Sequence, residues 1–128
     1  MATKSVSVRV IIQQRDDTGE VADKGFDQTV ELSSFSELTP GRRINLAASA
    51  DDYEVAFANA SLLFVYSHTN KFGVRVADGE TLQENLQMYG PFVSNAATNE
   101  VISGSILLTG NGSTPSDLEV WIVEKYVP

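Results

Sequence analysis

The sequence contains no cysteine, and this absence removes several kinds of site at once. A chain without thiols forms neither disulfides nor a metal centre with thiolate ligands. It also has a single histidine, which excludes a metal site built from several imidazoles. The sequence therefore predicts no cofactor and no metal centre of the nitrogen or sulfur type.

Positive charge is scarce: nine Lys and Arg stand against 17 Asp and Glu, for a net charge of −8. Such a balance argues against sequence-independent binding to nucleic acid or to an anionic membrane. The plainer interpretation is that acidity keeps a β-rich chain soluble, and the alternative is a basic partner surface. Apolar runs stay far below the about 20 residues of a membrane span, and the N-terminal residues lack the apolar core of a signal peptide. We therefore expect a soluble chain made inside the cell.

Sequence motifs of common enzyme classes are also missing. The sequence has no GxSxG, HExxH, P-loop or GxGxxG followed by a helix, and Gly110-Asn111-Gly112 is interpreted as a turn. His68 falls in a polar segment between two apolar runs, where a solvated loop residue is the favoured interpretation over a Ser-His-acid triad. No catalytic residue is predicted, although an enzyme of unrecognised family stays an alternative.

An acidic segment near the N-terminus raises the question of calcium, because this ion prefers oxygen ligands. The spacing is not that of an EF-hand, since Gly19 occupies a position where a ligand should stand. We favour a soluble hairpin turn and leave an irregular calcium site open. The acidic residues are Asp16, Asp17, Glu20, Asp23 and Asp27, and Asp51-Asp52 is a weaker instance.

Alternation of apolar and polar residues dominates the chain. Val6, Val8, Val10 and Ile12 fall on one face of an expected strand, and turn residues recur every eight to twelve positions or so, as at Thr39-Pro40-Gly41. This spacing predicts one all-β domain over residues 1–128, an antiparallel β-sandwich or jelly-roll-like fold of about eight short strands without a long helix. The expected strands include Phe26–Leu32, Arg42–Ala47, Val55–Asn59, Leu62–Tyr66 and Phe72–Ala77.

Two later segments carry sharper expectations. Residues 81–89 fit either a strand or one short turn of helix, ended by Gly90-Pro91. Residues 105–126 contain two apolar runs around a loop of Gly, Asn, Ser, Thr and Pro, which predicts a closing hairpin. Within it Val120-Trp121-Ile122-Val123 is apolar on both faces. This strand must be buried on both sides, either within its own domain or beneath another subunit.

The strand layout resembles the small all-β virion proteins encoded among the structural genes of tailed bacteriophages. The residues that carry the resemblance are Tyr53–Ala60, Leu62–Ser67, Val74-Arg75-Val76 and the segment Ser105–Val123. The resemblance implies a non-enzymatic capsid decoration (cement) protein located in the virion, which bridges and stabilises subunits of the major capsid protein. It also implies a homo-oligomer, with a trimer favoured, and leaves a neck or tail component as an alternative.

The two terminal strands are the expected contact surface of such a protein. The candidate interface residues are Val6, Val8, Ile11, Trp121 and Tyr126. A different class of function, a carbohydrate- or receptor-binding β-sandwich module, would instead use surface aromatic side chains.

Overall fold

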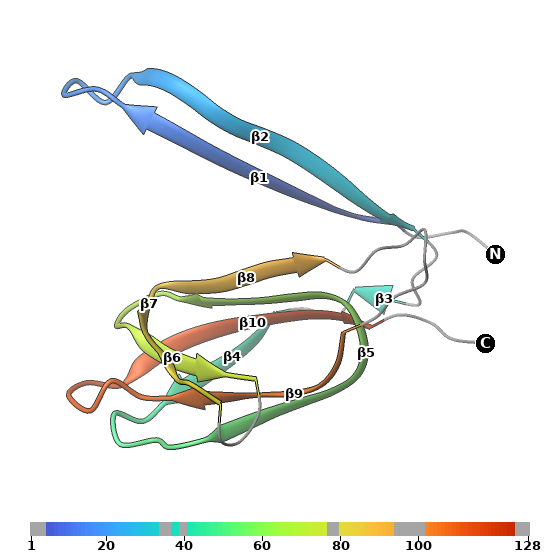
Figure 1. Cartoon of the computed structure of the whole chain (residues 1–128), viewed down its shortest axis with the longest axis vertical. Helices are drawn as coiled ribbons and strands as arrows, with labels where there is room; N and C mark the ends of the chain where they lie inside the picture. Colours follow the sequence, from blue (N-terminus) through green and yellow to red (C-terminus); the bar gives the residue numbers. More distant parts are fainter. Residues whose placement is uncertain (1–4, 34–36, 39–40, 77–79, 94–101, 125–128) are drawn as a thin grey trace.

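The computed structural model describes residues 5–33, 37–38, 41–76, 80–93 and 102–124 (Figure 1). This part of the chain holds ten strands, all paired antiparallel, and no helix, which confirms the all-β, sandwich-type expectation. The jelly-roll-like variant stays a prediction. The strands are β1 (Ser5–Arg15), β2 (Val21–Ser33), β3 (Glu37–Leu38), β4 (Arg42–Leu46), β5 (Tyr53–Ser67), β6 (Phe72–Arg75), β7 (Gln83–Leu86), β8 (Met88–Val93), β9 (Ile102–Thr109) and β10 (Ser116–Glu124).

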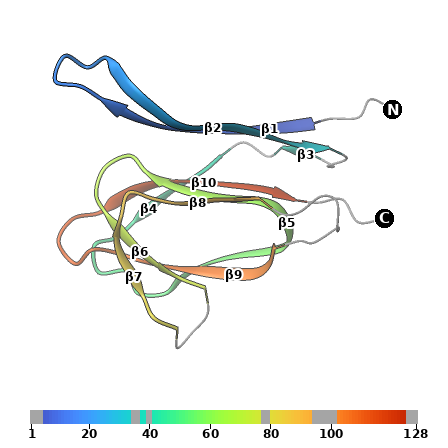
Figure 2. The ribbon, with the colours of Figure 1, turned by 45° about the horizontal axis from the view of Figure 1, so that its top comes forward.

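Strand β5 connects two layers of the body because it bends and changes partners along its 15 residues. Its first half pairs with β9, from Tyr53 opposite Leu108 to Ala60 opposite Ile102. Its second half lies between β10 and β8. One layer therefore contains β4, β10, β5 and β8, and the other contains β5, β9, β6 and β7 (Figures 1 and 2).

The hydrophobic core fills the space between these two layers. Alternate residues of each strand point inward, as at the neighbouring pairs Val65 and Val120 in one layer and Val55 and Ile106 in the other. Burying such side chains contributes roughly 1.5–3 kcal/mol each before entropy is subtracted. The buried cluster comprises Ile44, Leu46, Val55, Phe57, Ala60, Leu63, Val65, Phe72, Val74, Ile106, Leu108, Leu118 and Val120.

The expected closing hairpin is wrong in its pairing, although both of its strands exist. β9 and β10 are consecutive in the chain, yet β5 lies between them in the sheet. The loop after β9 crosses between the layers and binds the turn before β5: Gly110 N–H donates to the Ala50 carbonyl at 3.0 Å and Gly112 N–H to the Ala48 carbonyl at 2.8 Å. The composition of the loop between β9 and β10 indicates a turn. The two strands nevertheless pair with β5, because each buries an apolar face in the core.

Other expectations meet mixed outcomes. The ambiguous stretch 81–89 forms β7 and the start of β8, so the strand alternative is confirmed. Gly90-Pro91, expected to end this element, lies inside β8 with a cis peptide bond. Proline is tolerated there because β8 pairs only with β5 among the described strands, so one side of it is an edge. Thr39 and Pro40 of the expected Thr39-Pro40-Gly41 turn lie outside the described residues.

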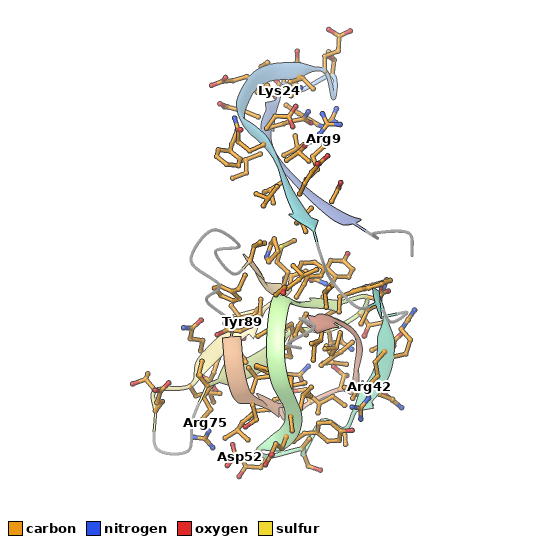
Figure 3. All side chains as sticks on the ribbon, turned by 90° about the vertical axis from the view of Figure 1, so that its right-hand side faces the viewer. Arg9, Lys24, Arg42, Asp52, Arg75 and Tyr89 are labelled. Atoms are coloured by element: carbon orange, nitrogen blue, oxygen red, sulfur yellow. The ribbon has the colours of Figure 1, made fainter. Side chains whose placement is uncertain are left out.

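The β1–β2 hairpin forms a sheet of its own and projects from the body (Figures 1 and 3). Its acidic turn is confirmed, and Asp16 closes it: Asp16 Oδ1 accepts hydrogen bonds from the amides of Thr18 at 2.9 Å and Glu20 at 3.1 Å. Two residues of β2, Ala22 and Gly25, have no counterpart on β1, so the register of the ribbon shifts twice near its tip.

Replacing Gly110 by alanine tests the loop crossing. A Cβ atom there would lie 2.3 Å from the Ala47 carbonyl oxygen and 2.6 Å from that of Ala48, both of them backbone atoms. We expect Gly110→Ala to lower the free energy of unfolding by roughly 1–3 kcal/mol in urea titrations. Gly25→Ala is the control, because its Cβ would meet nothing closer than 3.8 Å. Equal stability of the two variants would contradict the packing of this loop.

Candidate functional site

The β1–β2 hairpin has two chemically different faces. In the observed register Val8 lies opposite Val30 and Ile12 opposite Phe26, so these four side chains share one face. Ile12 is 62% exposed, Phe26 45% and Val30 46%. Gln28, opposite Val10, is the polar residue of this face. A ribbon whose face is otherwise apolar and is left in water marks an interaction surface.

The base of this face is the part that contacts the body. Val8 packs against the pair formed by Leu62 of β5 and Val123 of β10. Val93 of β8 packs against the same pair, and Val123 is completely buried. Leu62 and Val123 lie opposite each other on the outer face of the layer that contains β4, β10, β5 and β8, away from the core. The hairpin thus covers one end of an apolar surface on the body.

Beyond that contact the hairpin and the body diverge, and a groove of about 490 Å³ opens between them. On the body side its wall is formed by Phe64, Met88 and Trp121, with Met88 49% exposed. All the other lining residues come from the hairpin or flank this wall: Ser7, Val8, Arg9, Val10, Ile11, Leu62 and Pro91. Among the described lining residues the groove carries a single charged side chain, that of Arg9, and is otherwise almost entirely apolar. Figure 2 shows the hairpin running over the layer that contains β8 and β10.

The position of Trp121 shows what covers the two apolar faces of residues 120–123. Val120 and Ile122 face the core, whereas Trp121 lies on the outer face opposite Phe64 and lines the groove. The indole packs closely on Gly41, where a Cβ atom would come within 2.5 Å of the ring. Its Nε1–H donates to Glu119 Oε2. The strand is therefore buried on one face by its own core and partly covered on the other by its own hairpin.

Polar side chains continue the outer face past Trp121. Glu119 Oε1 lies 2.8 Å from His68 Nε2, and Arg43 binds Asp117 on the neighbouring strand. Hydrogen bonds from His68 and then Trp121 hold the pKa of Glu119 below its usual range, and the Arg43 guanidinium lowers the pKa of Asp117. His68 is exposed at the end of β5, so this cluster is an ion-pair network on the surface.

Three of the five candidate interface residues meet at the groove. Val8, Ile11 and Trp121 line it, although they come from opposite ends of the sequence. The side chain of Val6 and the whole of Tyr126 lie outside the described residues. The groove residues missed from the sequence are Leu62, Phe64, Met88 and Pro91. Residues 62–66 are apolar on both faces, as 120–123 are, and that shared signal would have pointed to the first two.

Two acidic residues of the hairpin, Asp16 and Asp27, bind partners within the hairpin. Asp27 Oδ2 forms ion pairs with Arg9 Nη2 at 2.8 Å and with Lys24 Nζ at 2.7 Å. Asp16 accepts the hydrogen bonds that close the turn. On the body, Asp52 binds Arg75 (Figure 3). Over the described ranges no group of three or more His, Asp or Glu is placed to hold a metal ion.

A smaller hollow of about 190 Å³ lies at the side of the body, beside two aromatic rings. The rings of Tyr89 and Phe92 are 4.8 Å apart and tilted at 58°. Burial raises the pKa of Tyr89, and Phe92 is 43% exposed. This hollow is the second candidate for a binding surface.

Comparisons with models of known protein families, with curated proteins and with solved structures returned no match. A search of the described residues for a long apolar helix able to cross a membrane found none.

Asp27→Asn tests what holds the hairpin together. The hydrogen bonds from Arg9 and Lys24 keep the pKa of Asp27 well below its usual range. A carboxylate with a lowered pKa stabilises the folded hairpin above its unfolded pKa of about 3.9, and this contribution is lost as the pH falls through the folded value. We expect wild-type β1 and β2 amides to lose hydrogen-exchange protection below about pH 4.

The Asp27→Asn variant should show weaker protection already at neutral pH and a flatter dependence on acid. Asp17→Asn is the matched control, since it removes one carboxylate from the exposed turn of the same hairpin. If Asp27→Asn and Asp17→Asn behaved alike, the ion pairs with Arg9 and Lys24 would not stabilise the ribbon.

Proposed function

We propose that this chain is a non-enzymatic structural protein of a bacteriophage virion, a capsid decoration protein that bridges subunits of the major capsid protein. The single observation that carries the proposal is the β1–β2 hairpin, which projects from the body with Ile12, Phe26 and Val30 exposed on one face. An apolar ribbon of this kind has no use in an isolated subunit and is suited to burial between subunits. The resemblance of the strand layout to phage virion proteins supports the same assignment.

Binding to assembled shells supplies the mechanism. A rigid sheet that buries apolar surface against several shell subunits at once binds the closed lattice and not the separate subunits. Ligands that bind one state stabilise it by mass action, so the lattice becomes harder to rupture. A homo-oligomer, with a trimer favoured, would match the symmetry of local threefold positions and multiply the contacts. A neck or tail component would use the same surface on another part of the virion.

Co-sedimentation with capsids tests this proposal. We expect the folded protein to pellet with intact capsids of its phage and to raise their rupture temperature. Phe26→Asp should weaken pelleting at least about tenfold, because it places a charge in the buried contact. Thr29→Asp, which adds the same charge on the polar face of the same strand, is the control. A folded wild-type protein that stays in the supernatant would refute the assignment.

The hollow beside Tyr89 and Phe92 favours one second candidate, a carbohydrate- or receptor-binding module. An exposed ring beside a shallow hollow suits stacking against a sugar. A glycan array separates the two proposals: specific hits that disappear in Phe92→Ala would support the module, and an array without hits would count against it.

A further inference from the structure

The hairpin is attached to the body in an unusual way. Among the described residues, every hydrogen bond and ion pair that begins in β1 or β2 ends within the hairpin, as with Arg9 to Asp27 and Arg15 to the Gly19 carbonyl. Its contact with the body is apolar, through Val8 against Leu62 and Val123. Apolar contacts are not directional, so the same contact can form with an identical face of another molecule.

This contact is also incomplete on both sides. On the hairpin, Ile12, Phe26 and Val30 continue the face that carries Val8 but stay exposed. On the body, the outer face continues from Leu62 to the groove wall of Phe64, Met88 and Trp121. Within one molecule the two surfaces diverge beyond Val8, so the hairpin covers only one end of the body's outer face.

We propose that the β1–β2 hairpin is an exchange arm, and that its apolar face docks on the outer face of β10, β5 and β8 in a second copy of this chain. The exchanged contact would repeat the one made by Val8 and extend it over Phe64, Met88 and Trp121. The inference rests on the proposed function in so far as that function requires a homo-oligomer. It identifies which surface joins the copies.

The distribution of charge is compatible with a second copy of this chain in the groove. Each chain carries a net charge of −8, so two copies repel one another unless their contact avoids the acidic residues. The described lining of the groove does so: Arg9 is the single charged residue in it, and this guanidinium is bound to Asp27. The acidic turn from Asp16 to Glu20 lies at the far end of the hairpin, away from the contact made by Val8.

Light scattering on three single variants tests the arm and the groove separately. We expect the wild type to be oligomeric, and Phe26→Asp in the arm or Met88→Asp in the groove to weaken association at least about tenfold. Both residues are already nearly half exposed, so a charge there should leave the fold intact, which circular dichroism checks. Thr29→Asp, on the polar face of the arm, should associate like the wild type.

Mixing the two defective variants provides the sharpest outcome. Phe26→Asp keeps an intact groove and Met88→Asp keeps an intact arm, so one good contact can form between them. We expect the mixture to yield a dimer, whereas each variant alone stays monomeric. Restoration also proves that both variants are folded. If either variant unfolds by itself, Phe26→Ser and Met88→Gln replace them in the same experiment.

Several results would overturn the exchange arm. A monomeric wild type, variants that associate normally, or a mixture that stays monomeric would each do so. The outcome is independent of capsid binding. An exchanged oligomer that ignores capsids would refute only the decoration function, whereas a monomer that pellets with capsids would refute only the exchange arm.

Discussion

The second half of β5 must be covered on both faces, and much of the structure follows from this requirement. Leu63 and Val65 point into the core between the layers, while Leu62 and Phe64 point to the outside of the same strand. A strand that is apolar on one face only can end a sandwich in water, but this one cannot. The outer face therefore needs a third layer, and among the described strands the β1–β2 hairpin provides part of it, over the end at Leu62 and Val123.

A two-stranded ribbon is a weak cover, because such a hairpin is marginally stable by itself in water. The ribbon is stabilised from within by Asp27, which binds both Arg9 and Lys24, and from below by the contact of Val8 with the body. Exposed ion pairs contribute little each, so the apolar contact is the stronger constraint on where the hairpin lies. Its small extent explains why the outer face stays open as a groove.

Local patterns in the sequence were sufficient for the all-β strand content and for part of the groove lining. The alternation of Val8, Val10 and Ile12 predicts an amphipathic strand, and the two apolar faces of residues 120–123 predict double burial. Trp121 and Val8 could thus be named as candidate interface residues, and both line the groove. Partner choice was harder to predict, because the turn-like loop at Gly110 suggests a hairpin, whereas β9 and β10 each pair with the bent β5. Pairing between distant strands depends on the packing of the whole core, which no local window contains.

The groove lining was equally hard to predict from local patterns. Met88 and Pro91 line the groove only because β8 pairs with the second half of β5. The walls of the groove diverge within one molecule, so apolar surface that could be buried stays exposed to water. The free energy of burying it becomes available when the chain meets a complementary surface. Stability and assembly are then coupled, because a partner that fills the groove also holds the hairpin in place. For a chain with a charge of −8, such coupling confines association to the few apolar surfaces where acidic residues do not meet.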